Sequence, residues 1–280
     1  MVHITRSLTG LTISLFLGLS ACTQNQSLVE PEPPQLLRLG ATRTNDPGQP
    51  RLRLKRTVST SPGLPGITEF LYDQQGRQSG YVYLGDTATF TYDANDRITS
   101  ILYSYTTREN VTGEQTIFAY DDAQREVRAT LSLLTTINGQ YAPLRAIKTS
   151  VYRMDGQNQP IGFTDTSPQS GASSAYEQTF AGGNLSRTIS QAGSSSRVAS
   201  DFTYDNRSNP FFGLIGPGIG DMRRFSRNNV LKLSMIDNFG SPTQAQPRDV
   251  YTIQYEFNEQ GLPTRAVSPG VVLRYEYESY

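Results

Sequence analysis

A short motif repeated along the chain is the feature that most limits its fold. Two aromatic residues separated by one position lead into Asp or Asn; polar residues and often Gly follow, then Arg or an aliphatic residue. Aromatic residues at i and i+2 lie on one face of a β-strand. Asp or Asn at the strand end caps a tight turn, and Gly supplies the positive φ that a bulged hairpin loop requires. Each copy therefore predicts one β-hairpin.

The copies extend over most of the chain after residue 50. The clearest aromatic pairs are Phe70/Tyr72, Phe90/Tyr92, Phe118/Tyr120, Phe202/Tyr204 and Tyr255/Phe257, and weaker copies begin at Met154 and Phe180. The residues expected to shape the turns are Asp73, Gly76, Asp93, Asp121, Asp205 and Gly261. Successive hairpins form an antiparallel meander, and no sustained helical periodicity is present. We therefore expect residues 51–280 to be an all-β domain, an antiparallel meander of repeated hairpins in one strongly curved sheet or barrel-like roll.

The N-terminal segment has the pattern of an export signal. Arg6 precedes an apolar run over residues 8–19, which is shorter than the roughly 20 apolar residues that cross a membrane as a helix. Leu19-Ser20-Ala21-Cys22 follows and resembles the lipobox of bacterial lipoproteins. This resemblance implies a signal peptide over residues 1–21, cleavage before Cys22, and attachment to a membrane by lipid on that cysteine. Residues 22–50 are polar and contain five prolines, which predicts a flexible or extended tether.

Composition excludes several kinds of chemistry. The chain has 25 basic and 25 acidic residues, and the expected signal peptide holds only Arg6 among them, so the charge gives no case for a nucleic-acid partner. The single histidine is His3, the single cysteine is Cys22, and tryptophan is absent. The mature domain therefore lacks the residues for a Ser-His-Asp site, a Cys-His site or a zinc site of His and Cys ligands. We expect neither a metal nor a cofactor.

Residues 206–227 form the longest interruption of the repeat and are the candidate ligand loop. The candidate residues are Phe211, Phe212, Arg223, Arg224 and Arg227. Long loops in compact domains often carry function, which suggests a lid or plug whose basic residues face an anionic ligand. The alternative is an apolar plug that closes one end of the rolled sheet and leaves the arginines in water, and the tendency of apolar loop residues to pack on the core favours it.

The hairpin motif resembles the YD repeats of Rhs-type proteins. A fuller resemblance covers nearly all of residues 51–280 and is to lipoproteins of Bacteroidota with a porin-like domain of unknown function. Its most specific part is Tyr204-Asp205-Asn206 followed by Asn209-Pro210-Phe211-Phe212-Gly213-Leu214, and residues 54–56, 226–230 and 255–264 complete it. The resemblance implies a curved or barrel-like antiparallel sheet in the cell envelope, without a known activity. Many strands place Thr, Ser, Arg or Asp on their second face, which disfavours a barrel that crosses the membrane.

These features predict an outer-membrane lipoprotein. Surface-exported lipoproteins of Bacteroidota tend to carry acidic residues just after the cysteine; residues 23–26 contain none, which favours the periplasmic side over the cell surface. We expect a non-enzymatic binding or structural β domain whose ligand is a glycan or a protein. The alternative is a carbohydrate-binding protein or a glycan-processing enzyme that uses paired carboxylates, which requires two carboxyl groups about 5–9.5 Å apart in a cleft.

Overall fold

The computed structural model describes residues 52–61, 64–106, 112–156, 158–192, 197–217 and 221–280, all within one compact unit. The expected signal peptide, Cys22 and the tether lie outside these residues. The elements are β1 (Leu52–Ser61), β2 (Leu64–Tyr72), β3 (Gln78–Tyr83), β4 (Asp86–Tyr92), β5 (Ile98–Ser104), β6 (Gly113–Asp121), β7 (Glu126–Ile137), β8 (Gln140–Met154), β9 (Pro160–Thr166), β10 (Ser173–Ala181), β11 (Asn184–Ala192), β12 (Val198–Ser208), α1 (Asp221–Arg224), β13 (Asn228–Ile236), β14 (Arg248–Thr252), β15 (Gln254–Phe257), β16 (Pro263–Ser268) and β17 (Val271–Ser279).

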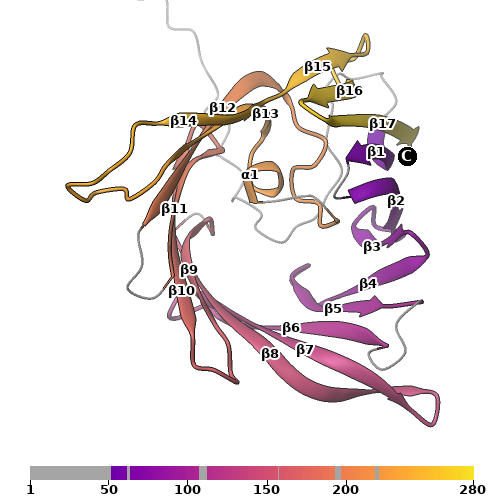
Figure 1. Cartoon of the computed structure of the whole chain (residues 1–280). Helices are drawn as coiled ribbons and strands as arrows, with labels where there is room; N and C mark the ends of the chain where they lie inside the picture. The colour runs from indigo at the N-terminus through magenta and orange to yellow at the C-terminus, as the bar shows by residue number, and fades with distance from the viewer. Residues whose placement is uncertain (1–51, 62–63, 107–111, 157, 193–196, 218–220) are drawn as a thin grey trace, which may run out of the picture. The chain divides into compact units, whose positions relative to one another are not determined.

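The strands pair antiparallel with their neighbours in the chain, and β1 also pairs with β17, so the meander forms a nearly closed barrel (Figure 1). β14 and β15 are two halves of one strand, separated by Ile253. β14 pairs with β13, whereas β15 pairs with β16. The predicted all-β antiparallel meander is confirmed, and the pairing of the first strand with the last makes it a barrel rather than an open curved sheet.

The turn of the repeat has the same three hydrogen bonds in the copies at Asp73, Asp93 and Asn258, and the copy at Asp155 has two of them among the described residues. In the first, the Asp73 carboxylate accepts from the backbone N–H groups of Gln75 and Arg77, at 3.0 and 2.9 Å, and the Gly76 N–H donates to the Asp73 carbonyl at 3.0 Å. The fourth residue of each such turn has a positive φ: Gly76 at 78°, Asp96 at 61°, Asn158 at 57° and Gly261 at 76°. These turns have the geometry that the motif predicts.

Three copies depart from this turn. The weak copy at Phe180 turns within two residues, Gly182 and Gly183, whose φ values are 58° and 78°. After Asp121, the positive φ of 53° falls on Arg125, the fifth residue of the copy, and the Asp121 carboxylate accepts from the Gln124 N–H at 2.9 Å. Asp205 lies within β12, and its carboxylate accepts from the backbone N–H and the side-chain amide of Asn229, both at 3.0 Å. Asp205 therefore differs from the expected hairpin turn, because the chain continues from β12 into the insertion instead of returning at once as the next strand.

Tyrosine hydroxyls of the repeat tie neighbouring hairpins together. Six of them donate to backbone carbonyls: Tyr72 to Leu54, Tyr92 to Gln78, Tyr120 to Ile98, Tyr204 to Leu185, Tyr255 to Val230 and Tyr277 to Pro263, at 2.5 to 3.0 Å. Burial raises the pKa of all six phenols, so they remain protonated donors. The aromatic residues of the repeat therefore form a structural ladder.

The arginine of the repeat links one turn to the next. Arg77 forms an ion pair with Asp73 of its own turn, at 2.7 Å, and with Asp96 of the following turn, at 2.5 Å. Its guanidinium also lies over the Tyr92 ring, 4.5 Å from the centroid. Arg97 repeats this arrangement with Asp93, Asp122 and Tyr120. The repeat thus sets the alignment of successive hairpins at this end of the barrel.

Replacement of Gly76 by valine tests the turn geometry. A β-branched residue is strained at a φ of 78°, so the free energy of unfolding should fall by about 1 kcal/mol or more, measured by urea denaturation. A Cβ at this position meets only the Tyr280 ring, at 4.0 Å, so the loss is conformational rather than steric. Gly76→Asn is the matched control, because Asn158 occupies the same turn position at a positive φ. Equal stability of the valine and asparagine variants would contradict the turn assignment.

The insertion between β12 and β13 folds into the barrel, and we call its described residues 209–217 and 221–227 the plug (Figure 1). Phe211 and Leu214, each 3% exposed, pack in one buried cluster with Leu54, Phe70 and Tyr275 of the wall. A hydrogen-bonded pair also holds the plug to the wall. The fully buried Gln78 side chain donates to the Ile215 carbonyl at 2.7 Å and accepts from the Ile215 N–H at 2.9 Å.

Candidate functional site

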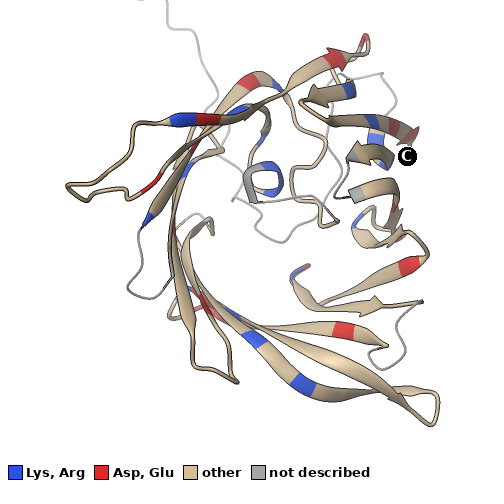
Figure 2. Ribbon diagram, in the orientation of Figure 1, with Lys and Arg blue, Asp and Glu red and all other residues tan. Residues whose placement is uncertain are grey.

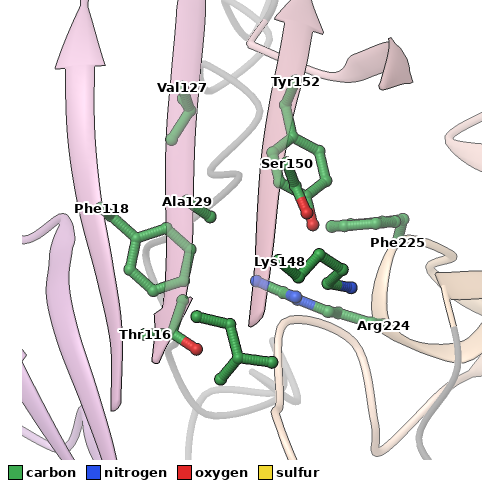
Figure 3. A pocket seen from close by; sticks show the side chains of 10 residues that line it. Thr116, Phe118, Val127, Ala129, Lys148, Ser150, Tyr152, Arg224 and Phe225 are labelled. Carbon is green, nitrogen blue, oxygen red and sulfur yellow. The ribbon is translucent and has the colours of Figure 1, made fainter. Parts of the chain in front are cut away.

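A chamber of about 180 Å³ lies between the plug and strands β6, β7 and β8. It is lined by Thr116, Phe118, Val127, Ala129, Leu131, Lys148, Ser150, Tyr152, Arg224 and Phe225. Figure 3 shows that Arg224 and Phe225 project from the plug towards Lys148, Ser150 and Tyr152 of β8. The chamber is therefore formed by two parts of the chain that are far apart in the sequence.

The strand register explains why these wall residues share one face. Thr116 lies opposite Leu131, which lies opposite Lys148, and the adjacent row on the same face is Phe118, Ala129 and Ser150. Side chains alternate between the two faces of a strand, so Lys148, Ser150 and Tyr152 of β8 all point inward. Phe118, Val127, Ala129 and Leu131 give the chamber an apolar half. Lys148 and Arg224, with three hydroxyl-bearing residues, give it a polar and cationic half.

The two cations of the chamber have different surroundings. The Lys148 ammonium lies 3.4 Å from the Asp165 carboxylate, which also accepts a 2.5 Å hydrogen bond from the Ser150 hydroxyl. Arg224 belongs to α1, whose basic residues lie inside the ring of strands (Figure 2). Its Nε is buried and has no hydrogen-bond partner in the described part of the chain, where no carboxylate pairs with its guanidinium either. The guanidinium carbon of Arg224 lies 5.0 Å from the centre of the Phe225 ring, and a guanidinium without a carboxylate partner beside a chamber is suited to an anionic acceptor from outside the protein.

The five candidate residues of the insertion have separate roles. Phe211 is buried in the core cluster, Phe212 is half-buried, and the Arg223 guanidinium lies 5.6 Å from the centre of the Phe211 ring. Arg227 is exposed at the end of the plug, and its N–H donates to the Gly183 carbonyl at 3.3 Å. Arg224 is the one among the five that lines the chamber. The insertion is thus an apolar plug that also places Arg223 and Arg224 inside the barrel, and of these two Arg224 lines the chamber.

The wall of the chamber and Phe225 were not predicted from the sequence. The sequence does place Lys148, Ser150 and Tyr152 at alternating positions, and a lysine on the same strand face as a partly buried tyrosine is unusual. That signal depends on knowing which face is inward. The turn residues Asp73, Gly76, Asp93, Asp121, Asp205 and Gly261 do not line the chamber.

No helix among the described residues is long and apolar enough to cross a membrane. Across the same residues, His, Cys, Asp and Glu form no group of three that is placed to hold a metal ion.

The fold and the chamber together define a class of protein: a nearly closed antiparallel barrel with an internal plug. No family model and no curated protein matches the chain. Among solved structures, it is similar to a porin-like protein from Bacteroides vulgatus, with 12% identity, 81% of this chain and 98% of that chain covered, and a TM-score of 0.49. A porin-like protein from Bacteroides uniformis has 13% identity, coverage of 80% and 98%, and a TM-score of 0.40. These are likenesses of fold at low sequence identity.

The structure of a TcdB2-TccC3-Cdc42 complex is also similar over a part of its length. The identity is 13%, 72% of this chain and 11% of that chain are covered, and the TM-score is 0.22.

Proposed function

We propose that this protein is a lipid-anchored, non-enzymatic binding protein of the cell envelope. Its ligand is a small molecule about the size of one benzene ring, held in the chamber between the plug and the wall. The observation that carries the proposal is the chamber itself, which has an apolar half and a cationic half inside the barrel. Ligand sites in proteins typically combine an apolar lining with a few placed polar groups. The lipid on Cys22 is the anchor in this proposal.

The outer face of the wall supports an anchored barrel that stays in water. Arg265 and Glu256 lie opposite each other on neighbouring strands and form an ion pair at 2.5 Å, next to the inward-facing pair Ala266 and Tyr255. Arg187 with Asp201, at 2.5 Å, and Arg56 with Glu276, at 2.7 Å, are further cross-strand ion pairs. A basic residue on a lipid-facing strand costs about 2–4 kcal/mol at the middle of a membrane. We infer that this wall does not face lipid and that the N-terminal lipid provides the attachment.

The lining of the chamber favours binding over glycan hydrolysis. A glycosidase needs two carboxyl groups placed on either side of the bond that it cleaves. The ten lining residues include no Asp or Glu, and the nearby Asp165 carboxylate is held by Lys148 and Ser150. A binding role is therefore the better match to this site.

A variant that fills the chamber tests the proposal. Ala129→Leu adds three carbon atoms on the inner wall, where Ala129 is 6% exposed, and should abolish the binding of one-ring compounds. Ligand-observed NMR with benzyl alcohol and benzoate should detect saturable binding of at least one of them to the unmodified protein. Ala175→Leu, on an exposed position of β10, is the control and should bind as the unmodified protein does. Failure of both probes to bind, or equal binding by Ala129→Leu, would overturn the chamber as a ligand site.

A further inference from the structure

We infer that the ligand of the chamber carries an acidic group on a small apolar body, and that Arg224 and Lys148 bind the anionic oxygens of that group. This inference rests on the proposed function, because it specifies the chemistry of the same site. A carboxylate and a phosphate ester present the same kind of oxygen to a guanidinium, so the shared chemistry is an anionic oxygen group.

The polar half of the chamber has more positive charge than its neighbours neutralise. Within the described ranges, Lys148 shares the Asp165 carboxylate with Ser150, whereas Arg224 has no carboxylate partner. An arginine fork binds carboxylates and phosphates through two parallel hydrogen bonds. Thr116 and Tyr152 add hydroxyl groups to the lining next to these cations, whereas the Ser150 hydroxyl already donates to Asp165. The arrangement is suited to an anion and poorly suited to a cation.

The apolar half limits the size and character of the rest of the ligand. An apolar cavity of about 150 Å³ is enough to hold benzene. The chamber volume of about 180 Å³ therefore accommodates one ring and one acidic group. Phe118 and Phe225 offer ring faces or edges to such a body, and Ala129 leaves space for it because its side chain is small. An inorganic ion alone would leave this apolar surface uncovered.

The test compares an acid with its neutral counterpart. Benzoate, phenyl phosphate and benzyl alcohol are titrated into the full protein and into the Arg224→Met and Lys148→Met variants, with affinities measured by NMR or calorimetry. We expect at least one of the two acids to bind more tightly than benzyl alcohol. Each variant should bind that acid at least about tenfold more weakly than the unmodified protein, because each loses a charged hydrogen bond. The affinity for benzyl alcohol should change much less. Arg227→Met, an exposed arginine of the same plug, is the matched control and should leave all affinities unchanged.

The outcomes separate this inference from the proposed function. The anion assignment is wrong if benzyl alcohol binds as tightly as both acids. It is also wrong if the Arg224 and Lys148 variants lose affinity for the acids and for benzyl alcohol equally. In either case the chamber remains a ligand site. If none of the three compounds binds to the unmodified protein, both proposals are wrong. Lys148 lies on the wall and Arg224 on the plug, so selective loss of the acids in both variants cannot be caused by movement of the plug alone. Thermal unfolding of each variant checks that it is folded.

Discussion

Replacement of Cys22 by alanine should move the protein from the membrane fraction to the soluble fraction and abolish labelling with radioactive or alkyne-tagged fatty acid. The expected effect is nearly complete, because this cysteine is the only thiol in the chain. Each buried methylene of a lipid chain contributes about 0.8 kcal/mol to membrane binding, so several chains on one residue make a permanent anchor. In the proposed arrangement, ion pairs on the outer wall such as that between Arg265 and Glu256 give the barrel itself little affinity for lipid.

The control for this experiment is Ser27→Ala, which changes the tether beyond the lipobox and should leave both labelling and membrane attachment intact. Carbonate washing separates anchored protein from protein that is held to the membrane by other proteins. Release of the Cys22 variant would support the proposed anchor and the water-facing wall. If the unlabelled Cys22→Ala protein stays in washed membranes, the wall itself holds the membrane, and the proposal of a lipid-anchored barrel in water is wrong.

Asn209→Ala should lower the free energy of unfolding by about 3 kcal/mol or more, because each buried polar group left without its partner costs about 1–3 kcal/mol. The Asn209 side chain is 2% exposed and makes three hydrogen bonds inside the plug. Its amide donates to the carbonyls of Arg223 and Ser226 at 2.6 and 2.7 Å, and its oxygen accepts from the Phe211 N–H at 2.9 Å. Alanine leaves all three backbone groups unpaired, and urea denaturation measures the loss.

Two further variants test whether the lost hydrogen bonds of Asn209 cause the loss of stability. Asn209→Asp keeps the size and the acceptor but replaces the two N–H donors with a carboxylate oxygen facing the carbonyls of Arg223 and Ser226, so it should also destabilise strongly. Asn206→Ala, at an exposed position just before the plug, should change stability by less than about 0.5 kcal/mol. Because Asn209 holds the segment that carries Arg224, the alanine variant should also lose affinity for ligands of the chamber. A loss of stability below about 1 kcal/mol in Asn209→Ala would show that the plug does not depend on this residue.

Much of the local structure was predictable from individual residues. Asp73 and Gly76 indicated the bulged turn, and the structure has it at the same residues. The copy at Met154 was weak in sequence, yet Asp155 and Asn158 form the same turn, because Asn tolerates a positive φ nearly as well as Gly. The hairpin turn predicted at Asp205 was wrong, because this residue continues β12 and its carboxylate bonds to Asn229 of β13 across the insertion.

The sequence by itself determined the hairpins and the face on which their aromatic residues lie, since capping hydrogen bonds, positive φ and strand alternation act over a few residues. Only the tertiary structure decided that β1 meets β17, that the insertion enters the barrel, and that Arg224 of the plug faces Lys148 of the wall. Those arrangements depend on the curvature accumulated over the whole sheet and on packing between segments far apart in the chain, and no short stretch of residues encodes either of them.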